Sequence, residues 1–414
     1  MKDPGKKVGE VAVGRRRFLK TAVTLTGLAI AQSAVPTLRA EAQETPKAPE
    51  DPTKVPGALP TPYGRRSAFE RAERLPRGQI SLTPHQDLHG IITPSALHFE
   101  RHHNGVPLID PASHKLLVHG LVERPMVFTT EDLKRFPSVS RIAFIECSGN
   151  SFSEWAGPPG QTVQQTHGLM STSEWTGVAL ATVLRECGVK PEATWMLAEG
   201  SDSAAMTRSI PLAPMLNEAI LAYAQNGEPL RPEQGYPLRL LLPGWEGNTN
   251  IKWLRRLELG VAPWMTREET SHYTDLMPDG TARQFTFVME AKSVITSPSG
   301  GQRIKPGFVE VRGLAWSGRG RVTRVEVSAD GGRTWRTAQL QEPALPKCHT
   351  RFTFAWRWTG EEAILQSRCT DETGYVQPTR RALIGVRGAN SVYHFNAVQS
   401  WKIATDGSVS NVHV

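Results

Sequence analysis

The chain has 414 residues, of which 39% are hydrophobic and 21% charged, a profile typical of a globular protein. This length is too great for one ordinary core, so we expect two folded domains. The formal net charge is +8, but the first 42 residues hold eight Lys and Arg against three Asp and Glu, which leaves about +3 for the rest. That small excess argues against nucleic-acid binding.

The first 42 residues carry the features of an export signal. Residues 14–20 are Gly-Arg-Arg-Arg-Phe-Leu-Lys, followed by a weakly apolar stretch over residues 21–35 and an Ala-Glu-Ala site at residues 40–42. This order predicts a twin-arginine signal peptide and a periplasmic location. A membrane anchor is disfavoured because the apolar stretch is shorter than the roughly 20 residues of a spanning helix, and we expect no later membrane span. Since the twin-arginine route is associated with proteins exported already folded, we also expect a bound cofactor.

Residues 43–82 are rich in Pro, Ala and charge without lasting periodicity, and predict a linker or an arm that contacts a partner. Over residues 83–284 short apolar runs alternate with helical patterns, which indicates an α+β domain. The expected strands include residues 116–118 and 238–242, and the expected helices include residues 178–186 and 212–225.

From residue 285 to residue 414 the hydrophobic pattern alternates with a period of two, which is typical of strands. Asp330, Gly331 and Gly332 supply a hairpin turn. This spacing predicts a β-sandwich of immunoglobulin-like kind. The clearest alternating runs are residues 308–311, 322–327 and 351–354.

The four cysteines, at positions 147, 187, 348 and 369, are scattered without C-x-x-C spacing and do not make a disulfide framework. Cys187 ends a helical pattern and is expected in a core. Cys348 and Cys369 lie in the same downstream domain and could pair after export. Covalent haem attachment before His349 would need a cysteine at position 345, where the chain has Leu345.

Cys147 follows a strand-like run, residues 144–146, and precedes a glycine turn. A thiol presented at a strand end is a candidate ligand for a soft metal. The alternative is an inert core cysteine, since free cysteines are among the most buried residues. Segments elsewhere in the chain favour the metal site.

Three further segments, taken together with Cys147, carry a family resemblance. They are residues 99–103 (Phe-Glu-Arg-His-His), residues 234–254 with their Pro-Gly and Lys-Trp pairs, and residues 385–388 (Gly-Val-Arg-Gly). In this order the chain resembles the sulfite oxidase family of molybdenum enzymes over residues 85–402. The resemblance implies an α+β molybdopterin-binding catalytic domain followed by an all-β immunoglobulin-like dimerisation domain. Residues 270–275 and 393–397 are most similar to the molybdenum subunits of bacterial sulfur oxidation.

The resemblance implies which residues hold the molybdenum cofactor. Cys147 matches the thiolate ligand of the metal, and one thiolate suffices because the pterin dithiolene and oxo groups supply the other ligands. Arg239 and Lys252 match positions that hold the pterin phosphate, which suits a guanidinium fork and a point charge. The alternative for these two is a solvated strand end. Further cofactor contacts are expected from His103, Gln234, Asn248 and Asn250.

Three residues are expected in the substrate pocket. Arg101 and Arg387 match arginines of that pocket, where permanently charged donors suit oxyanions of sulfur. Either could instead form a surface ion pair. Tyr273 is matched to an active-site tyrosine, although the usual Asp-Tyr order is absent and Asp275 follows it.

Two positions depart from the family pattern. Ser151 and Phe152 stand where sulfite oxidases generally have a pair of arginines, and Gln234 stands where they have a histidine. The first change removes positive charge beside the metal, which weakens attraction for free sulfite and leaves space for sulfur on a bulky carrier. We therefore expect carrier-bound sulfane sulfur as the substrate.

The implied reaction adds oxygen to sulfur and releases two electrons, so an acceptor is needed. The chain has no haem or flavin motif, which predicts a separate c-type cytochrome partner. A sulfur carrier protein is the expected substrate, and the family's tendency to dimerise predicts a homodimer within a heterotetramer. Three alternatives remain open: a dehydrogenase of free sulfite, a molybdenum reductase of sulfoxides, whose relatives typically lack the sandwich domain, and an exported binding module without chemistry.

Overall fold

The computed structural model describes residues 55–158 and 161–414. The chain divides into two compact units, residues 1–65 and residues 66–414. The described part of the first unit, residues 55–65, forms neither helix nor strand. The predicted export signal, residues 1–42, lies outside the described residues. In the described ranges no helix has the length and apolar character needed to cross a bilayer.

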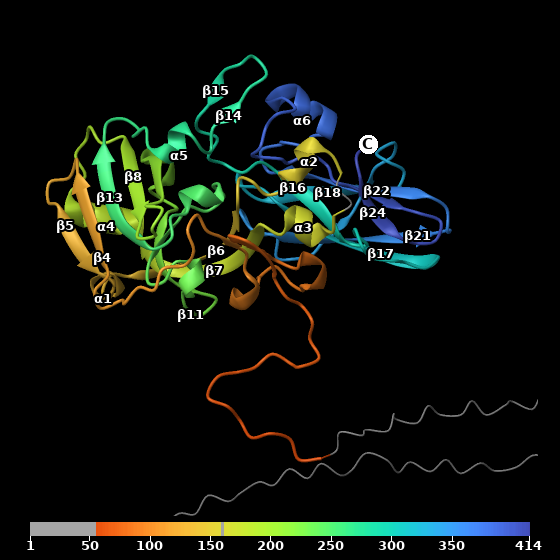
Figure 1. The fold of residues 1–414 in the computed structure, drawn as a ribbon, viewed down its shortest axis with the longest axis horizontal. Coiled ribbons are helices and arrows are strands. Elements are labelled where there is room, and N and C mark those ends of the chain that lie inside the picture. The colour runs from red at the N-terminus through yellow and green to blue at the C-terminus, as the bar shows by residue number, and fades with distance from the viewer. Residues whose placement is uncertain (1–54, 159–160) are drawn as a thin grey trace, which may run out of the picture. The chain divides into compact units, whose positions relative to one another are not determined.

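The first half of the second unit contains two five-stranded sheets that share one core (Figure 1). One has the order β11-β10-β7-β6, with β12 also paired to β10, and the other has the order β5-β4-β13-β8-β9. The first sheet comprises β6 (Ser138–Glu146), β7 (Met170–Ala179), β10 (Ile220–Gln225), β11 (Glu228–Pro229) and β12 (Arg239–Leu241). The second comprises β4 (Lys115–Gly120), β5 (Met126–Thr129), β8 (Trp195–Gly200), β9 (Thr207–Pro211) and β13 (Leu254–Gly260).

Short helices and a small sheet complete this half. Thr129 caps the first helix and forms a capping box with Asp132, and Thr162 does the same with Gln165. Helix α4 ends at Gly188, whose positive φ of 70° suits glycine. The helices are α1 (Thr130–Lys134), α2 (Ser153–Ala156), α3 (Val163–His167), α4 (Leu180–Cys187) and α5 (Arg267–Thr270), and the small sheet is β1 (Leu75–Arg77), β2 (Ile80–Leu82) and β3 (Glu100–Arg101).

The second half is a β-sandwich of two antiparallel sheets, in the orders β16-β17-β21-β20 and β19-β18-β22-β23-β24. Alternate residues face the shared core: Phe352 and Phe354 are buried, whereas Thr353 between them is only half-buried. The strands are β16 (Lys292–Ser297), β17 (Gly307–Trp316), β18 (Val322–Ser328), β19 (Arg336–Thr337), β20 (Gln339–Leu340), β21 (Thr350–Trp358), β22 (Ala363–Asp371), β23 (Ser400–Ile403) and β24 (Val409–Val412).

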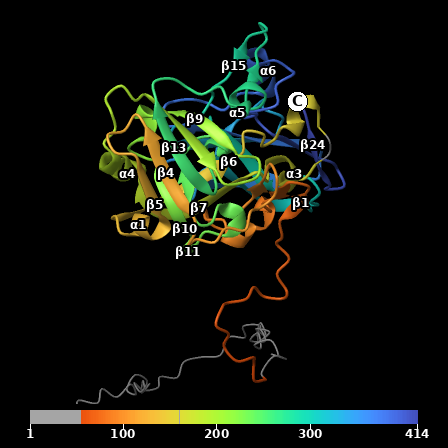
Figure 2. The ribbon, with the colours of Figure 1, turned by 60° about the vertical axis from the view of Figure 1, so that its left-hand side comes forward.

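A hairpin and a helix lie where the two halves meet. The hairpin is β14 (Asp275–Leu276) with β15 (Ala282–Arg283), and the helix is α6 (Arg380–Arg387). Both views place them side by side at the top of the molecule (Figures 1 and 2). This is the region in which residues of the sandwich reach the first half.

As expected, a first half that mixes sheets with short helices is followed by a β-sandwich, and the structure differs from the sequence analysis in local details. The helix expected at residues 212–225 is wrong: a 3₁₀ turn (Ala213–Met215) precedes strand β10, because residues 220–225 pair with β7 and β12. The disulfide left open between Cys348 and Cys369 does not form, and Cys348 Sγ instead donates to the Ile142 carbonyl at 2.8 Å. Residues 75–82, expected in the linker, pair as β1 and β2.

Candidate active site

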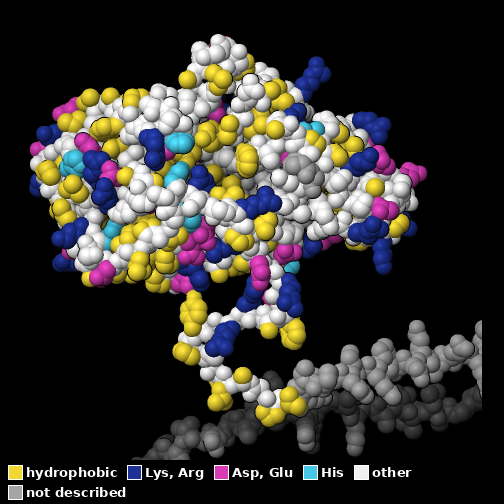
Figure 3. Space-filling view, in the orientation of Figure 1, with side chains coloured by type: hydrophobic (Ala, Val, Ile, Leu, Met, Phe, Trp, Pro, Cys, Tyr) yellow, Lys and Arg dark blue, Asp and Glu magenta, His cyan; other side chains and the backbone are white. Residues whose placement is uncertain are grey.

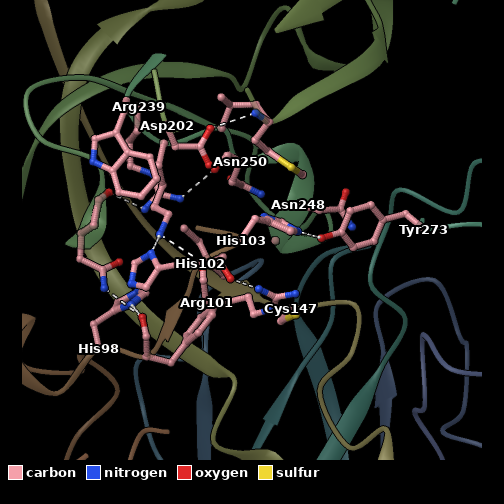
Figure 4. Close-up of a pocket in the computed structure, with 18 residues that line it drawn as sticks. His98, Arg101, His102, His103, Cys147, Asp202, Arg239, Asn248, Asn250 and Tyr273 are labelled. Carbon is pink, nitrogen blue, oxygen red and sulfur yellow. Dashed lines mark hydrogen bonds between the residues drawn. The ribbon is translucent and has the colours of Figure 1, made fainter. Parts of the chain in front are cut away.

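Eighteen residues line a pocket beside the end of β6 (Figure 4). They come from residues 98–103, the end of β6, residues 202–206, residues 234–253, and Tyr273. Nine of the ten residues expected from the sequence are among them, and Arg387 is not. The pocket therefore collects side chains that lie far apart in the chain.

Cys147 is the first residue after β6 and is partly exposed in the pocket. Its backbone N–H donates to the Leu169 carbonyl at 2.9 Å, and its carbonyl accepts from the Asn150 N–H at 2.8 Å. Burial raises the pKa of the Cys147 thiol, so a nearby cation is needed to stabilise the thiolate. A Cβ at Gly247 would lie 2.9 Å from the Glu146 carbonyl oxygen, so this glycine allows the close approach of the two loops.

Two cationic side chains, Arg239 and Lys252, line the pocket. The Arg239 guanidinium lies 4.7 Å from the centroid of the Trp175 ring and donates to the carbonyls of Gln234 and Asn250 at 2.9 and 3.1 Å. Its Nε has no hydrogen-bond partner among the described residues. Burial lowers the pKa of Arg239 to about 9.

Lys252 is the second of these cations. Its Nζ donates to the carbonyls of Arg101 and Glu233 at 3.2 and 3.1 Å, and contacts Nδ1 of His102 at 2.8 Å. Burial, and then the charge of Arg239, lower the pKa of Lys252 well below its ordinary value. Within the described ranges, no carboxylate lies within 4.0 Å of either cation.

His103 and Tyr273 form a hydrogen-bonded pair at the other side of the pocket, with 2.8 Å between Nε2 and the phenol oxygen (Figure 4). Burial, followed by the charge of Arg101, lowers the pKa of His103 to about 4, and burial raises the pKa of Tyr273. At neutral pH both groups are therefore uncharged. Tyr273 has a φ of 46°, and the Arg208 guanidinium lies 5.1 Å from its ring centroid.

Two of the three expected amide side chains, Gln234 and Asn250, form hydrogen bonds with backbone groups. Gln234 donates to the Phe99 carbonyl at 2.9 Å. Asn250 accepts from the Leu242 N–H at 2.7 Å and donates to the Glu246 carbonyl at 3.1 Å. Asn248 differs, because it donates to Ser148 Oγ at 3.2 Å and to a Glu246 carboxylate oxygen at 2.8 Å. It thus contacts the loop that carries Cys147.

The two expected substrate arginines occupy different places. Arg101 lines the pocket, and its guanidinium donates to the carbonyl of His102. Arg387 is buried at the end of α6, where Nη1 lies 3.2 Å from Asp275 Oδ2 and Nη2 lies 3.7 Å from Glu290 Oε2. It lines a smaller second cavity with Lys292 and His394. Only Arg101 faces the same pocket as Cys147.

Comparison with known proteins identifies the family. The model of the "Oxidoreductase molybdopterin binding domain" matches residues 103–267, and that of the "Mo-co oxidoreductase dimerisation domain" matches residues 283–401. Sulfite oxidase of Gallus gallus is 32% identical over 326 residues, which cover 72% of this chain and 71% of that protein. The chain belongs to the sulfite oxidase family. It is a molybdenum-dependent oxidoreductase, and its cofactor is the molybdenum cofactor.

A solved structure and a group of longer enzymes are also similar to this chain. The crystal structure of the sulfane dehydrogenase SoxCD from Paracoccus pantotrophus matches with a TM-score of 0.85 and 47% identity, over 87% of this chain and 96% of that chain. Nitrate reductase [NAD(P)H] of Hordeum vulgare is 33% identical over 341 residues, 70% of this chain. The chain spans only about a third of the length of the nitrate reductases (37% in that case).

The pocket suits the cofactor of the sulfite oxidase family. Arg239 is buried and Lys252 half-buried, and neither has a carboxylate partner among the described residues. A charge removed from water is stable only when it is compensated. The pterin phosphate would supply that negative charge, and Arg239 Nε, which has no partner among the described residues, would donate to it. Cys147 supplies a thiol where a soft metal needs one. These three residues would hold the cofactor.

Residues that the sequence analysis did not single out support the pocket. Arg208 on β9 is fully buried, forms ion pairs with Glu246 and Glu269 at 3.3 and 3.1 Å, and donates to Asn248. Arg208 stands two residues before the buried Ile210, so both side chains face the same side of the strand. An arginine on the inward-facing side of a strand is the sequence signal that could have pointed to it. Further pocket-lining residues outside the expected set include His98, Asp202, Met206 and Trp253.

Proposed function

We propose that this chain is the molybdenum subunit of a periplasmic sulfane dehydrogenase. It oxidises sulfane sulfur held on a cysteine of a carrier protein and passes the electrons to a c-type cytochrome. The observation that supports this most is Phe152, which is 56% exposed five residues after Cys147. An exposed aromatic ring at this position suits contact with a protein more than attraction of a small dianion.

The residue before it also supplies no charge to the substrate. Ser151 is buried, and its Oγ accepts a hydrogen bond from Lys292 Nζ at 3.0 Å. Lys292 in turn pairs with Glu146, so its charge is compensated inside the protein. Positions 151 and 152 therefore offer no free cation, in contrast to the arginine pair of sulfite oxidases. This favours a substrate whose binding energy comes from the carrier.

The cofactor, when bound, transfers oxygen to the substrate sulfur and accepts two electrons. The chain's own residues bind and orient the substrate. Arg101 is the permanently charged donor in the pocket and would hold the anionic end of the substrate or the sulfonate-like product. The neutral pair of His103 and Tyr273 would hold a proton between Nε2 and the phenol oxygen and offer the substrate an uncharged hydrogen-bonding side of the pocket.

The location, domains and partners form part of the same proposal. Residues 1–42 would direct twin-arginine export to the periplasm, and residues 43–82 would contact a partner. Residues 83–284 would form the catalytic domain and residues 285–414 the domain through which two chains dimerise. The similarity to SoxCD supports a partner subunit, and the family model named for dimerisation supports a dimer. A cytochrome is proposed as that partner because the chain has no haem or flavin motif of its own.

A dehydrogenase of free sulfite is the second candidate. It is favoured by Arg101, which lines the pocket and suits a sulfur oxyanion, and by the 32% identity with sulfite oxidase of Gallus gallus. The difference between the two candidates lies in the size of the group attached to sulfur.

Substrate kinetics separate the two candidates. The molybdenum-loaded enzyme would be assayed for kcat/KM with sulfite and with a carrier protein that bears sulfane sulfur on a cysteine. We expect the carrier to be preferred, and Phe152→Arg to shift the ratio toward sulfite about tenfold, the effect of one charged hydrogen bond. Phe152→Leu is the matched control and should keep the preference. A strong preference of the unmodified enzyme for sulfite would establish the second candidate instead.

A further inference from the structure

Lys292 lies deep between the two halves of the molecule. It is the first residue of β16 and only 1% exposed. Its Nζ donates to Glu146 Oε1 and to Ser151 Oγ, each at 3.0 Å, and contacts the Asn150 carbonyl at 3.5 Å. A lysine of the sandwich therefore binds residues on both sides of Cys147.

Both carboxylate oxygens of Glu146, the ion-pair partner of Lys292, accept hydrogen bonds. Glu146 is buried, and its Oε1 also accepts from Asn150 Nδ2 at 2.9 Å. Its Oε2 accepts from Trp316 Nε1 at 2.7 Å, and Trp316 belongs to β17 of the sandwich. We call Glu146, Ser151, Lys292 and Trp316 the Lys292 cluster. Two of its members come from each half of the molecule.

The cluster determines the course of the short loop that presents the thiol. Ser151 has a φ of 68°, a left-handed conformation that is unfavourable for serine unless its surroundings hold it. The loop is also bound by the sandwich at its middle, where the backbone N–H of His394 donates to the Ser148 carbonyl at 2.8 Å. The loop thus has contacts to the second half at residues 146, 148, 150 and 151.

We propose that Lys292 is a positioning residue for the metal ligand: by binding Glu146 and Ser151 it holds Cys147 in one geometry. The inference rests on Cys147 as the thiolate ligand and not on the identity of the sulfur substrate. It gives the sandwich domain a part in the metal site in addition to any part in dimerisation. Since Lys292 is not among the residues that line the pocket, it would act on Cys147 through the loop.

The test compares Lys292→Met, which keeps much of the length and removes the charge, with Lys402→Met. Lys402 lies on β23 of the same domain, is more exposed and pairs with Glu362 at 2.8 Å. The first readout is the electron paramagnetic resonance spectrum of the one-electron-reduced holoenzyme. The second is the alkylation rate of Cys147 in the full chain produced without cofactor, followed by peptide mass spectrometry.

We expect Lys292→Met to broaden or split the resonance signal and to raise the alkylation rate about tenfold or more, as loss of a charged hydrogen bond would. Lys402→Met should change neither readout. Ser151→Ala removes one contact without unpairing a buried charge, and should raise the alkylation rate about threefold. If Lys292→Met does not fold, the alkylation rate and the spectrum of Ser151→Ala test the inference instead.

An unchanged spectrum and alkylation rate in Lys292→Met, or in Ser151→Ala where only that variant folds, would overturn the inference. Neither readout involves the sulfur substrate. A failure of the sulfane proposal would therefore appear in the kinetic ratio alone, and a failure of this inference would appear in the spectrum and the alkylation rate alone.

Discussion

At the scale of single residues, the cofactor pocket is defined by a few side chains whose chemistry the sequence already indicates. Cys147, Arg239 and Lys252 lie within short motifs, so their identity and order could be predicted without coordinates. For Arg208 the strand pattern could indicate an inward-facing side chain but not its role, because its partners Glu246 and Glu269 lie about forty and sixty residues away in the chain. For Arg387 the family resemblance predicted a place in the substrate pocket, whereas in the structure its guanidinium pairs with Asp275.

The first prediction concerns the thiol. Cys147→Ser should abolish turnover and lower the molybdenum content, because an alcohol is a far poorer ligand for this metal than a thiolate. Turnover and metal analysis of the purified variant measure this. Cys187→Ser is the control: this residue is buried in the core away from the pocket, so it should lose stability and retain its metal. Full activity with stoichiometric molybdenum in Cys147→Ser would remove the metal-ligand assignment.

A second prediction concerns pH and the buried His85. Burial, and then the charge of Arg351, lower its pKa from 6.5 to about 4. Between these values the unfolded chain binds a proton that the folded chain does not, so stability is complete above pH 6.5 and is lost as the pH falls toward 4. We expect Tm to fall over this range and His85→Asn to flatten the decline. The exposed His89→Asn should keep the slope, and equal slopes in both variants would contradict the assignment.

At the scale of elements, strands with strict alternation were predictable and the chain's turn-rich segments were not. Residues 322–327 lie in β18 as expected, because alternation matches a half-buried strand. Residues 212–225 looked helical, yet Pro214 lies in a 3₁₀ turn and residues 220–225 pair on both sides with β7 and β12. Pairing with two neighbours outweighs local preference, and such pairing is absent from a local pattern.

The contact between α6 and β14 leads to the third prediction. Arg387 pairs with the buried Asp275, two residues after Tyr273, and lies 3.7 Å from Glu290. Arg387→Met leaves a buried carboxylate unpaired, so we expect a loss of about 3 to 5 kcal/mol in the free energy of unfolding. Denaturant unfolding measures it.

Two further variants make that experiment decisive. Arg381→Met, at an exposed position of the same helix, should have little effect. Adding Asp275→Asn to Arg387→Met should restore part of the stability, because the unpaired charge is then gone. If Arg387→Met keeps its stability and changes only KM, the arginine acts on substrate and the pairing is incidental.

At the scale of the whole molecule, the second half holds the loop of the first half that carries Cys147. The change of pattern near residue 285 was enough to predict two domains, because alternation replaces mixed periodicity there. The contacts between them were not predictable, because Lys292 and His394 reach residues 146–151 from more than 140 positions away. In Figure 3 the visible face at the top, over the hairpin and α6, carries several hydrophobic side chains among polar ones.

The last prediction concerns the effect of the cofactor pocket on the stability of the whole unit. Without cofactor, Arg239 is buried and Lys252 half-buried with no carboxylate partner among the described residues, and burial and then the charge of Arg239 lower the pKa of Lys252. Cofactor-free protein should therefore melt at a lower temperature than the loaded enzyme, and inorganic phosphate should raise its Tm by mass action. Calorimetry with increasing phosphate measures the effect.

The matched variants decide whether the pocket is responsible. In Arg239→Met one of the two repelling charges is gone, so the cofactor-free form should gain less Tm from phosphate than the unmodified chain. Lys134→Met, on an exposed part of α1, should respond to phosphate as the unmodified chain does. An equal phosphate response in all three proteins would mean that the anion binds elsewhere, and the assignment of Arg239 and Lys252 to the pterin phosphate would lose its support.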